Sequence, residues 1–166
     1  MFVPAEDFVV SYGAADLATC ERATHVMKKS PNDIRKLQVS GFYLDIDLQD
    51  ASSDPDQVKE KYNELTGDNG SYESDSRHTL LEMQVDLDLP GFEDSQNGKL
   101  TGISLPYVVT IDLGSRQILA IRRNWYEADR LKNKREHFVH YQYIPGLGFY
   151  GFGLIHMIGG LAKSAT

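Results

Sequence analysis

The most regular pattern of apolar and polar residues in the chain is LLEMQVDLDL, residues 80–89. In this stretch Leu81, Met83, Val85, Leu87 and Leu89 alternate with acidic residues and a glutamine. A period of two is typical of a β-strand that buries one of its faces. We therefore expect a strand over residues 80–89 with its odd-numbered side chains in the core, ended by Pro90 and Gly91.

Three further segments have the composition of strands. SLPYVVTIDL, residues 104–113, and RQILAIRRNWY, residues 116–126, are separated by Gly114 and Ser115, which favour a tight hairpin. HFVHYQYI, residues 137–144, follows the charged segment EADRLKNKRE. Four consecutive strands with short or polar connections predict an antiparallel four-stranded meander.

Two helix starts precede these strands. Ser30 can cap a helix that has Pro31 in its first turn and that we expect to end near Val39. A second start over residues 53–56 opens a short amphipathic helix that Gly67 is placed to stop. The predicted fold class is α+β, with both short helices on one side of the sheet and a truncated helix at the C-terminal end. The expected regions are residues 1–50, with extended segments over 5–12 and 23–29 and the first helix, residues 51–144, with the α+β domain, and residues 145–166, with a glycine-rich turn and the truncated helix.

The C-terminal segment is the most apolar part of the chain, because no residue from Ile144 to Ala162 is charged. Its length would suit a membrane-spanning helix, but Pro145 and the glycines at 146, 148, 151, 153, 159 and 160 disfavour a continuous helix. Two other interpretations are a glycine-rich loop that enters a core helix, and a helical element that packs between subunits. The sequence pattern leaves all three open.

The charge distribution points to one positive zone in an acidic chain. The formal net charge is −7, yet many of the 17 lysines and arginines lie between residues 116 and 135. Such a zone can meet phosphates or an acidic partner, and it can equally be a solvated loop. The candidate contact residues are Arg130, Lys132, Lys134 and Arg135. The single cysteine, Cys20, excludes an internal disulfide and fits a reducing compartment.

Signals for catalysis and for metal binding are weak. The five histidines have no metal-ligand spacing, and the chain contains no nucleophile elbow and no phosphate-binding loop. Asp86 and Asp88 lie on one face of the predicted strand, where a solvated sheet face explains them better than paired acid–base catalysis in a small hydrolase. We therefore expect no enzyme activity, no cofactor and no metal.

Several long stretches resemble the portal proteins of tailed bacteriophages. They are DIRKLQVSGFY (33–43), LPYVVTID (105–112), ILAIRRNW (118–125) and HFVHYQYIPGLGFYGFGLIHMIGGLAKSAT (137–166). The resemblance implies an internal piece of a longer subunit, with the clip region flanked by stem-like or wing-like segments. Residues 1–50 are expected to be such a wing-like or stem-like segment.

The resemblance also implies a function and partners. Portal subunits form a dodecameric ring at one capsid vertex, through which double-stranded DNA passes during packaging and ejection. The expected partners are other copies of the chain, the terminase large subunit and head–tail adaptor proteins, in the virion and, during assembly, in the host cytoplasm. The expected subunit contacts are Phe149, Phe152, Leu154, Ile155 and Ile158. The alternative is a membrane-active protein whose apolar C-terminal segment inserts into a bilayer.

Overall fold

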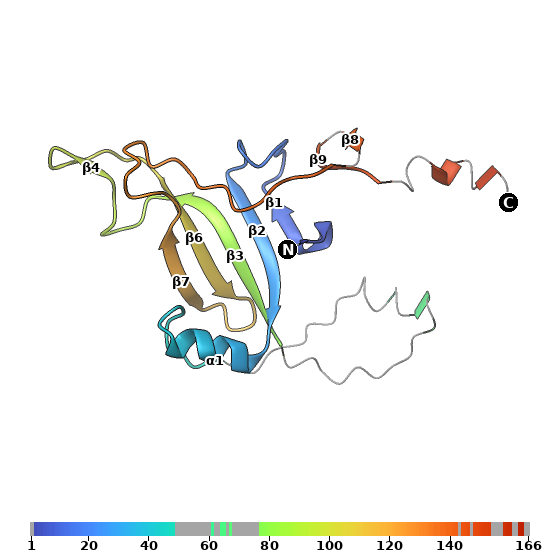
Figure 1. Cartoon of the computed structure of the whole chain (residues 1–166), viewed down its shortest axis with the longest axis horizontal. Helices are drawn as coiled ribbons and strands as arrows, with labels where there is room; N and C mark the ends of the chain where they lie inside the picture. Colours follow the sequence, from blue (N-terminus) through green and yellow to red (C-terminus); the bar gives the residue numbers. More distant parts are fainter. Residues whose placement is uncertain are drawn as a thin grey trace. The chain divides into compact units, whose positions relative to one another are not determined.

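A computed structural model describes residues 2–48, 61, 64–65, 67, 77–142, 144–146, 148–153, 158–160 and 163–164. The described part has an α+β fold, as expected, in which helix α1 accompanies a five-stranded antiparallel sheet (Figure 1). The elements are η1 (Ala5–Asp7), β1 (Phe8–Val10), β2 (Arg22–Lys29), α1 (Pro31–Val39), β3 (His78–Leu87), β4 (Ser95–Gln96), β5 (Lys99–Leu100), β6 (Leu105–Asp112), β7 (Ile118–Arg123), β8 (Ile144–Gly146) and β9 (Gly148–Phe152).

The sheet has the strand order β1-β2-β3-β6-β7, while β4-β5 and β8-β9 form separate two-stranded sheets. Three of the predicted strands are present as β3, β6 and β7, which are neighbours in the sheet. The prediction of a fourth meander strand over residues 137–144 is wrong, because residues 137–142 form no strand and Ile144 begins β8. β2 takes the place beside β3 instead, and β1 pairs with β2 in an antiparallel register that sets Phe8 opposite His25.

Helix α1 begins as the sequence predicts. The Ser30 hydroxyl accepts a hydrogen bond from the Asp33 amide at 3.2 Å, and Pro31 occupies the first turn. The helix ends at Val39, and Gly41 follows with a φ of 72°, a conformation that favours glycine. Of the second predicted helix the structure describes only residues 61, 64, 65 and 67, so that prediction lies mostly outside the described residues.

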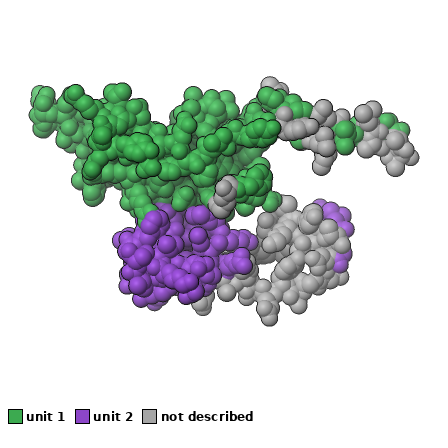
Figure 2. Space-filling model, in the orientation of Figure 1, with its two compact units in different colours: residues 1–26, 82–109, 121–166 green, residues 27–81, 110–120 purple. Residues whose placement is uncertain are grey.

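The chain forms two compact units, each built from segments distant in the sequence (Figure 2). One unit comprises residues 1–26, 82–109 and 121–166, and the other comprises residues 27–81 and 110–120. The core of the first unit contains Phe8, Cys20, Ala23 and Phe149. The core of the second unit contains Ile34, Tyr43, Leu80, Leu119 and Ala120. The expected regions divided at residues 50 and 144 stay a prediction.

The buried face of β3 differs from the predicted one. Leu80 is 0% exposed, whereas Leu81, Met83 and Val85 are only half-buried. The reason is that Leu80 belongs to the same core cluster as Ile34 of α1, so at this position the even-numbered side chain is the buried one. The alternation correctly predicted a strand but not the face that the helix selects.

Candidate functional site

The loop over residues 127–136 carries the candidate contact residues, and the structure gives most of its cations partners within the chain. Lys132 forms an ion pair with Asp94, and its ammonium also lies 5.9 Å from the centre of the Trp125 ring. The hydrogen bond from Lys132, together with one from Thr101, holds the pKa of the Asp94 carboxyl below its usual value. Lys132 therefore fastens this loop to the segment that carries Asp94.

Lys134 is fixed by backbone oxygens. Its ammonium donates hydrogen bonds to the carbonyls of Leu17 at 3.0 Å and Cys20 at 3.2 Å. Charge-assisted hydrogen bonds of this kind are stronger than those between neutral groups. Lys134 thus ties the loop to the turn that precedes β2, and its charge satisfies carbonyls of its own chain.

Arg135 and Arg130 differ in their surroundings. The Arg135 guanidinium lies 4.4 Å from the centre of the Tyr126 ring, within the range of a cation–π contact, and its amide donates to the Asn124 carbonyl. Arg130 is exposed, next to Asp129, whose carboxylate accepts the amides of residues 131 and 133. These hydrogen bonds lower the pKa of the Asp129 carboxyl, and the one from the Asn133 amide has the largest effect. They also make the loop tip an ordered turn.

The glycine-rich C-terminal segment forms a hairpin over its first part. β8 and β9 pair antiparallel. Gly151 has a φ of 66°, and a Cβ atom at this position would clash with the Ile144 oxygen at 2.7 Å, so the hairpin requires glycine here. Residues 158–160 and 163–164 are helical. None of the helices in the described part of the chain is long and apolar enough to cross a membrane.

The expected subunit contacts fall into three groups. Phe149 is buried in its own chain, where its ring centre lies 6.0 Å from that of Phe8 and 3.9 Å from that of His140. Phe152 and Ile158 are 42% and 48% exposed. Leu154 and Ile155 lie outside the described residues. Only Phe152 and Ile158, within the described part, are thus placed to reach another molecule.

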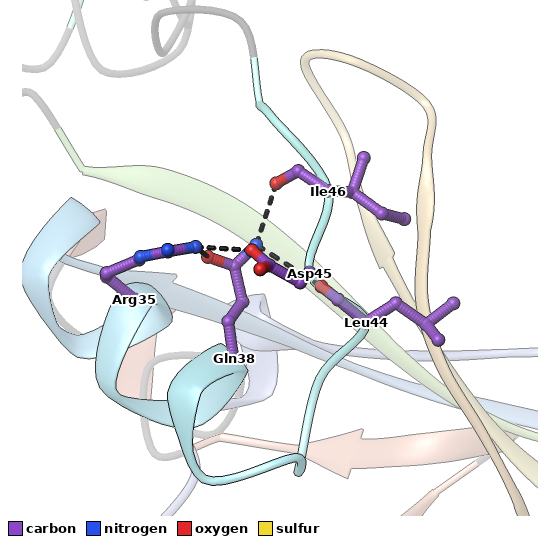
Figure 3. A network of polar contacts seen from close by, with 5 residues as sticks. All are labelled: Arg35, Gln38, Leu44, Asp45 and Ile46. Atoms are coloured by element: carbon purple, nitrogen blue, oxygen red, sulfur yellow. Dashed lines mark hydrogen bonds and ion pairs between the residues drawn. The ribbon is translucent and has the colours of Figure 1, made fainter.

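A pocket of about 520 Å³ lies between α1, residues 45–48 and His78. Figure 3 shows Arg35, Gln38 and Asp45, which line the pocket, in contact with one another and with the segment after α1. Arg35 forms an ion pair with Asp45 and donates to the Gln38 amide oxygen, while the Gln38 amide nitrogen donates to the Leu44 and Ile46 carbonyls at 3.2 and 2.7 Å. These contacts fasten the segment after α1 to the helix.

Beside this pocket, the buried side chains of Asp112 and His78 are in contact, and the sequence analysis did not predict this pair. Asp112 accepts hydrogen bonds from the amide and the hydroxyl of Ser115, at 2.7 and 2.6 Å, and its other oxygen lies 3.2 Å from His78 Nδ1. The turn from Asp112 to Ser115 has a local signal, since aspartate often caps such turns. His78 has none, because it is 34 residues away in the sequence.

The remaining acidic residues and the cysteine singled out in the sequence lie elsewhere. Asp86 and Asp88 are both exposed near the end of β3. Among the described residues, no group of three or more histidine, cysteine, aspartate or glutamate side chains could hold a metal ion. Cys20 is buried, and its thiol donates to the Arg22 carbonyl at 2.8 Å.

Comparison with known proteins yields no match to a family model, to a curated protein or to a solved structure.

Proposed function

We propose that this chain is part of the structural subunit of a phage portal ring, which forms the DNA channel at a capsid vertex and is not itself an enzyme. The observation that carries the proposal is the resemblance of residues 33–43, 105–112, 118–125 and 137–166 to portal proteins. In this proposal the partners are further copies of the chain, the terminase large subunit, head–tail adaptors and DNA that passes without sequence recognition. The protein acts in the virion and, before that, in the host cytoplasm.

The charge pattern suits a channel that lets DNA slide. A net charge of −7 repels phosphates, while a sparse cation can make transient contacts with them. Because Lys132, Lys134 and Arg135 have partners within the chain, Arg130 is the strongest candidate of the four for a contact with DNA or with an acidic docking protein. The other three hold the loop that presents it.

A packaging assay tests this contact. Rings assembled from the Arg130→Glu subunit should package DNA more slowly than wild-type rings, because a repulsive charge replaces an attractive one. The matched control is Arg116→Glu, which makes the same charge change at an exposed turn between β6 and β7. Equal packaging rates for wild type, Arg130→Glu and Arg116→Glu would contradict the proposed contact.

The membrane-active alternative makes a different prediction. An inserting C-terminal segment would carry the exposed Phe152 and Ile158 into a bilayer, so the chain would sediment with liposomes. The portal proposal predicts that the chain stays in the supernatant.

A further inference from the structure

Residues 136–142 have the composition of a strand, but their backbone groups pair with no other described residue. They follow the loop, and none of them is in a turn or bend. The last backbone hydrogen bond before them joins the Arg135 amide to the Asn124 carbonyl. Within the part of the chain that the structure describes, no hydrogen bond reaches a backbone amide or carbonyl of residues 136–142. This segment therefore presents the hydrogen-bonding groups that an added strand would pair with.

Alternate side chains of the segment hold it in place. The Phe138 ring centre lies 4.9 Å from that of Phe8, and the His140 ring stacks on Phe149 at 3.9 Å. The Gln142 amide donates to the carbonyls of residues 148 and 149. Because these contacts already fix an extended segment, little conformational entropy remains to be lost when it pairs with another strand.

The opposite side of the segment is apolar and open. Val139 is 97% exposed and Tyr141 is 87% exposed. No lysine and no proline occurs between His137 and Gln142, although these are the residues by which proteins usually protect an unpaired strand. The side chains that alternate with the anchored ones are thus suited to cover a neighbouring molecule.

The same unit contains the end of a sheet edge that could receive such a strand, over residues 121–123 of β7. The earlier part of that edge is already used, because the Leu119 carbonyl accepts the Leu44 amide. β7 is the last strand in the order β1-β2-β3-β6-β7. The Asn124 amide donates to the carbonyl of Pro106, the second residue of β6, so the backbone groups of Ile121 and Arg123, which have the opposite orientation in the strand, point away from β6. Ile121 is 45% exposed, and no hydrogen bond within the described residues reaches the outward backbone groups of these two residues.

We propose that residues 136–142 of one copy of this chain pair as a strand with the β7 edge of a second copy. The chain carries both halves of the contact, a fixed extended segment and an open strand edge, on different parts of its surface. Glu136 and Arg123, which are both exposed, give the two halves opposite charges at one end. A contact between two different surfaces is head-to-tail, and it closes into a ring when the rotation permits. This inference rests on the proposed function, for which it names a subunit contact.

Sedimentation velocity on the 166-residue chain tests the contact with variants of each half. Ile121→Pro removes an outward amide of β7 without removing a bond to β6, and Val139→Asp with Tyr141→Asp places charges on the open side of the segment. Each change should weaken self-association at least about tenfold, the effect of losing roughly 1.4 kcal/mol. The control variants, Ile121→Thr and Val139→Thr with Tyr141→Thr, keep the amides and the strand preference and should associate more strongly than the test variants.

Mixing the two test variants shows whether the contact is head-to-tail, between two different surfaces of the chain. Each variant retains one intact half, so the mixture should form a one-to-one pair and nothing larger. Circular dichroism and thermal unfolding identify a variant that has lost its fold, and Ile121→Lys then replaces Ile121→Pro. The inference is overturned if Ile121→Pro and Ile121→Lys associate like wild type, or if the wild-type chain stays monomeric at every concentration. Either result leaves the proposed function standing if the whole gene product still assembles into a ring, and failure of that assembly contradicts the proposed function itself.

Discussion

Replacing Lys134 by methionine would measure how much a cation of the loop contributes to stability. Methionine keeps most of the aliphatic length of the side chain but cannot donate to the Leu17 and Cys20 carbonyls, which now accept at 3.0 and 3.2 Å. Hydrogen bonds from a charged group contribute about 1.5–3 kcal/mol each when buried. Because Lys134 is only half-buried and water can replace part of the loss, we expect the free energy of unfolding to fall by about 2 kcal/mol.

Thermal unfolding followed by tryptophan fluorescence gives the assay. The single tryptophan, Trp125, lies in the same unit as Lys134, with its ring centre 5.4 Å from that of Tyr107. For a domain of this size, a loss of about 2 kcal/mol lowers Tm by roughly 4–8 °C. The matched control is Arg130→Met, which removes a cation from an exposed position in the same loop and should change stability by less than about 0.5 kcal/mol.

Comparison of the two variants can refute the reasoning. If Lys134→Met and Arg130→Met have the same Tm as wild type, the hydrogen bonds to Leu17 and Cys20 contribute nothing. If both lower Tm equally, the net charge of the loop matters and the individual contacts do not. Only a selective effect of Lys134→Met supports a structural role for that cation.

Two further predictions concern the core and the acid stability. Leu80→Ala should lower the free energy of unfolding by about 2–5 kcal/mol, because Leu80 is fully buried, whereas Leu113→Ala, at an exposed position, should change it by less than about 0.5 kcal/mol in the same urea titration. The lowered pKa of Asp94 means that its interaction with Lys132 stabilises the fold above the usual carboxyl pKa of 3.8 and is lost as the pH falls through the lower folded value. The stability difference between wild type and Lys132→Met should therefore be largest near neutral pH and vanish in strong acid, and a difference that does not change with pH would contradict this linkage.

Local signals in the sequence predicted local structure well. Ser30 and Pro31 predicted the start of α1, and the turn at Gly114 and Ser115 predicted the hairpin of β6 and β7. In each case the residues that decide the conformation are neighbours in the chain. The capping hydrogen bond of Ser30, for example, reaches only three residues along.

Features that depend on distant residues were not predictable in this way. The alternation over residues 80–89 predicted a strand correctly. Which face of that strand becomes buried depends on α1, which precedes the strand by many residues. The composition of residues 137–144 indicated a strand, but whether such a segment joins the sheet depends on which strands already occupy the places in it. β1 and β2 extend the sheet on the β3 side, and residues 137–142 stay outside it.

The candidate site illustrates the same limit. Clustering in the sequence identified Arg130, Lys132, Lys134 and Arg135 as a group, but it could not separate the cations by their partners. The acceptors of Lys134 lie 117 and 114 residues away in the sequence. Likewise, His78 and Asp112 have no shared local motif, and only the fold brings them together.

The mass in solution of the whole gene product that contains these residues tests the central claim most directly. Light scattering across a range of concentrations should give a closed ring of about twelve copies, as a head-to-tail contact between identical subunits allows. A mass that corresponds to a monomer at every concentration would contradict the portal proposal.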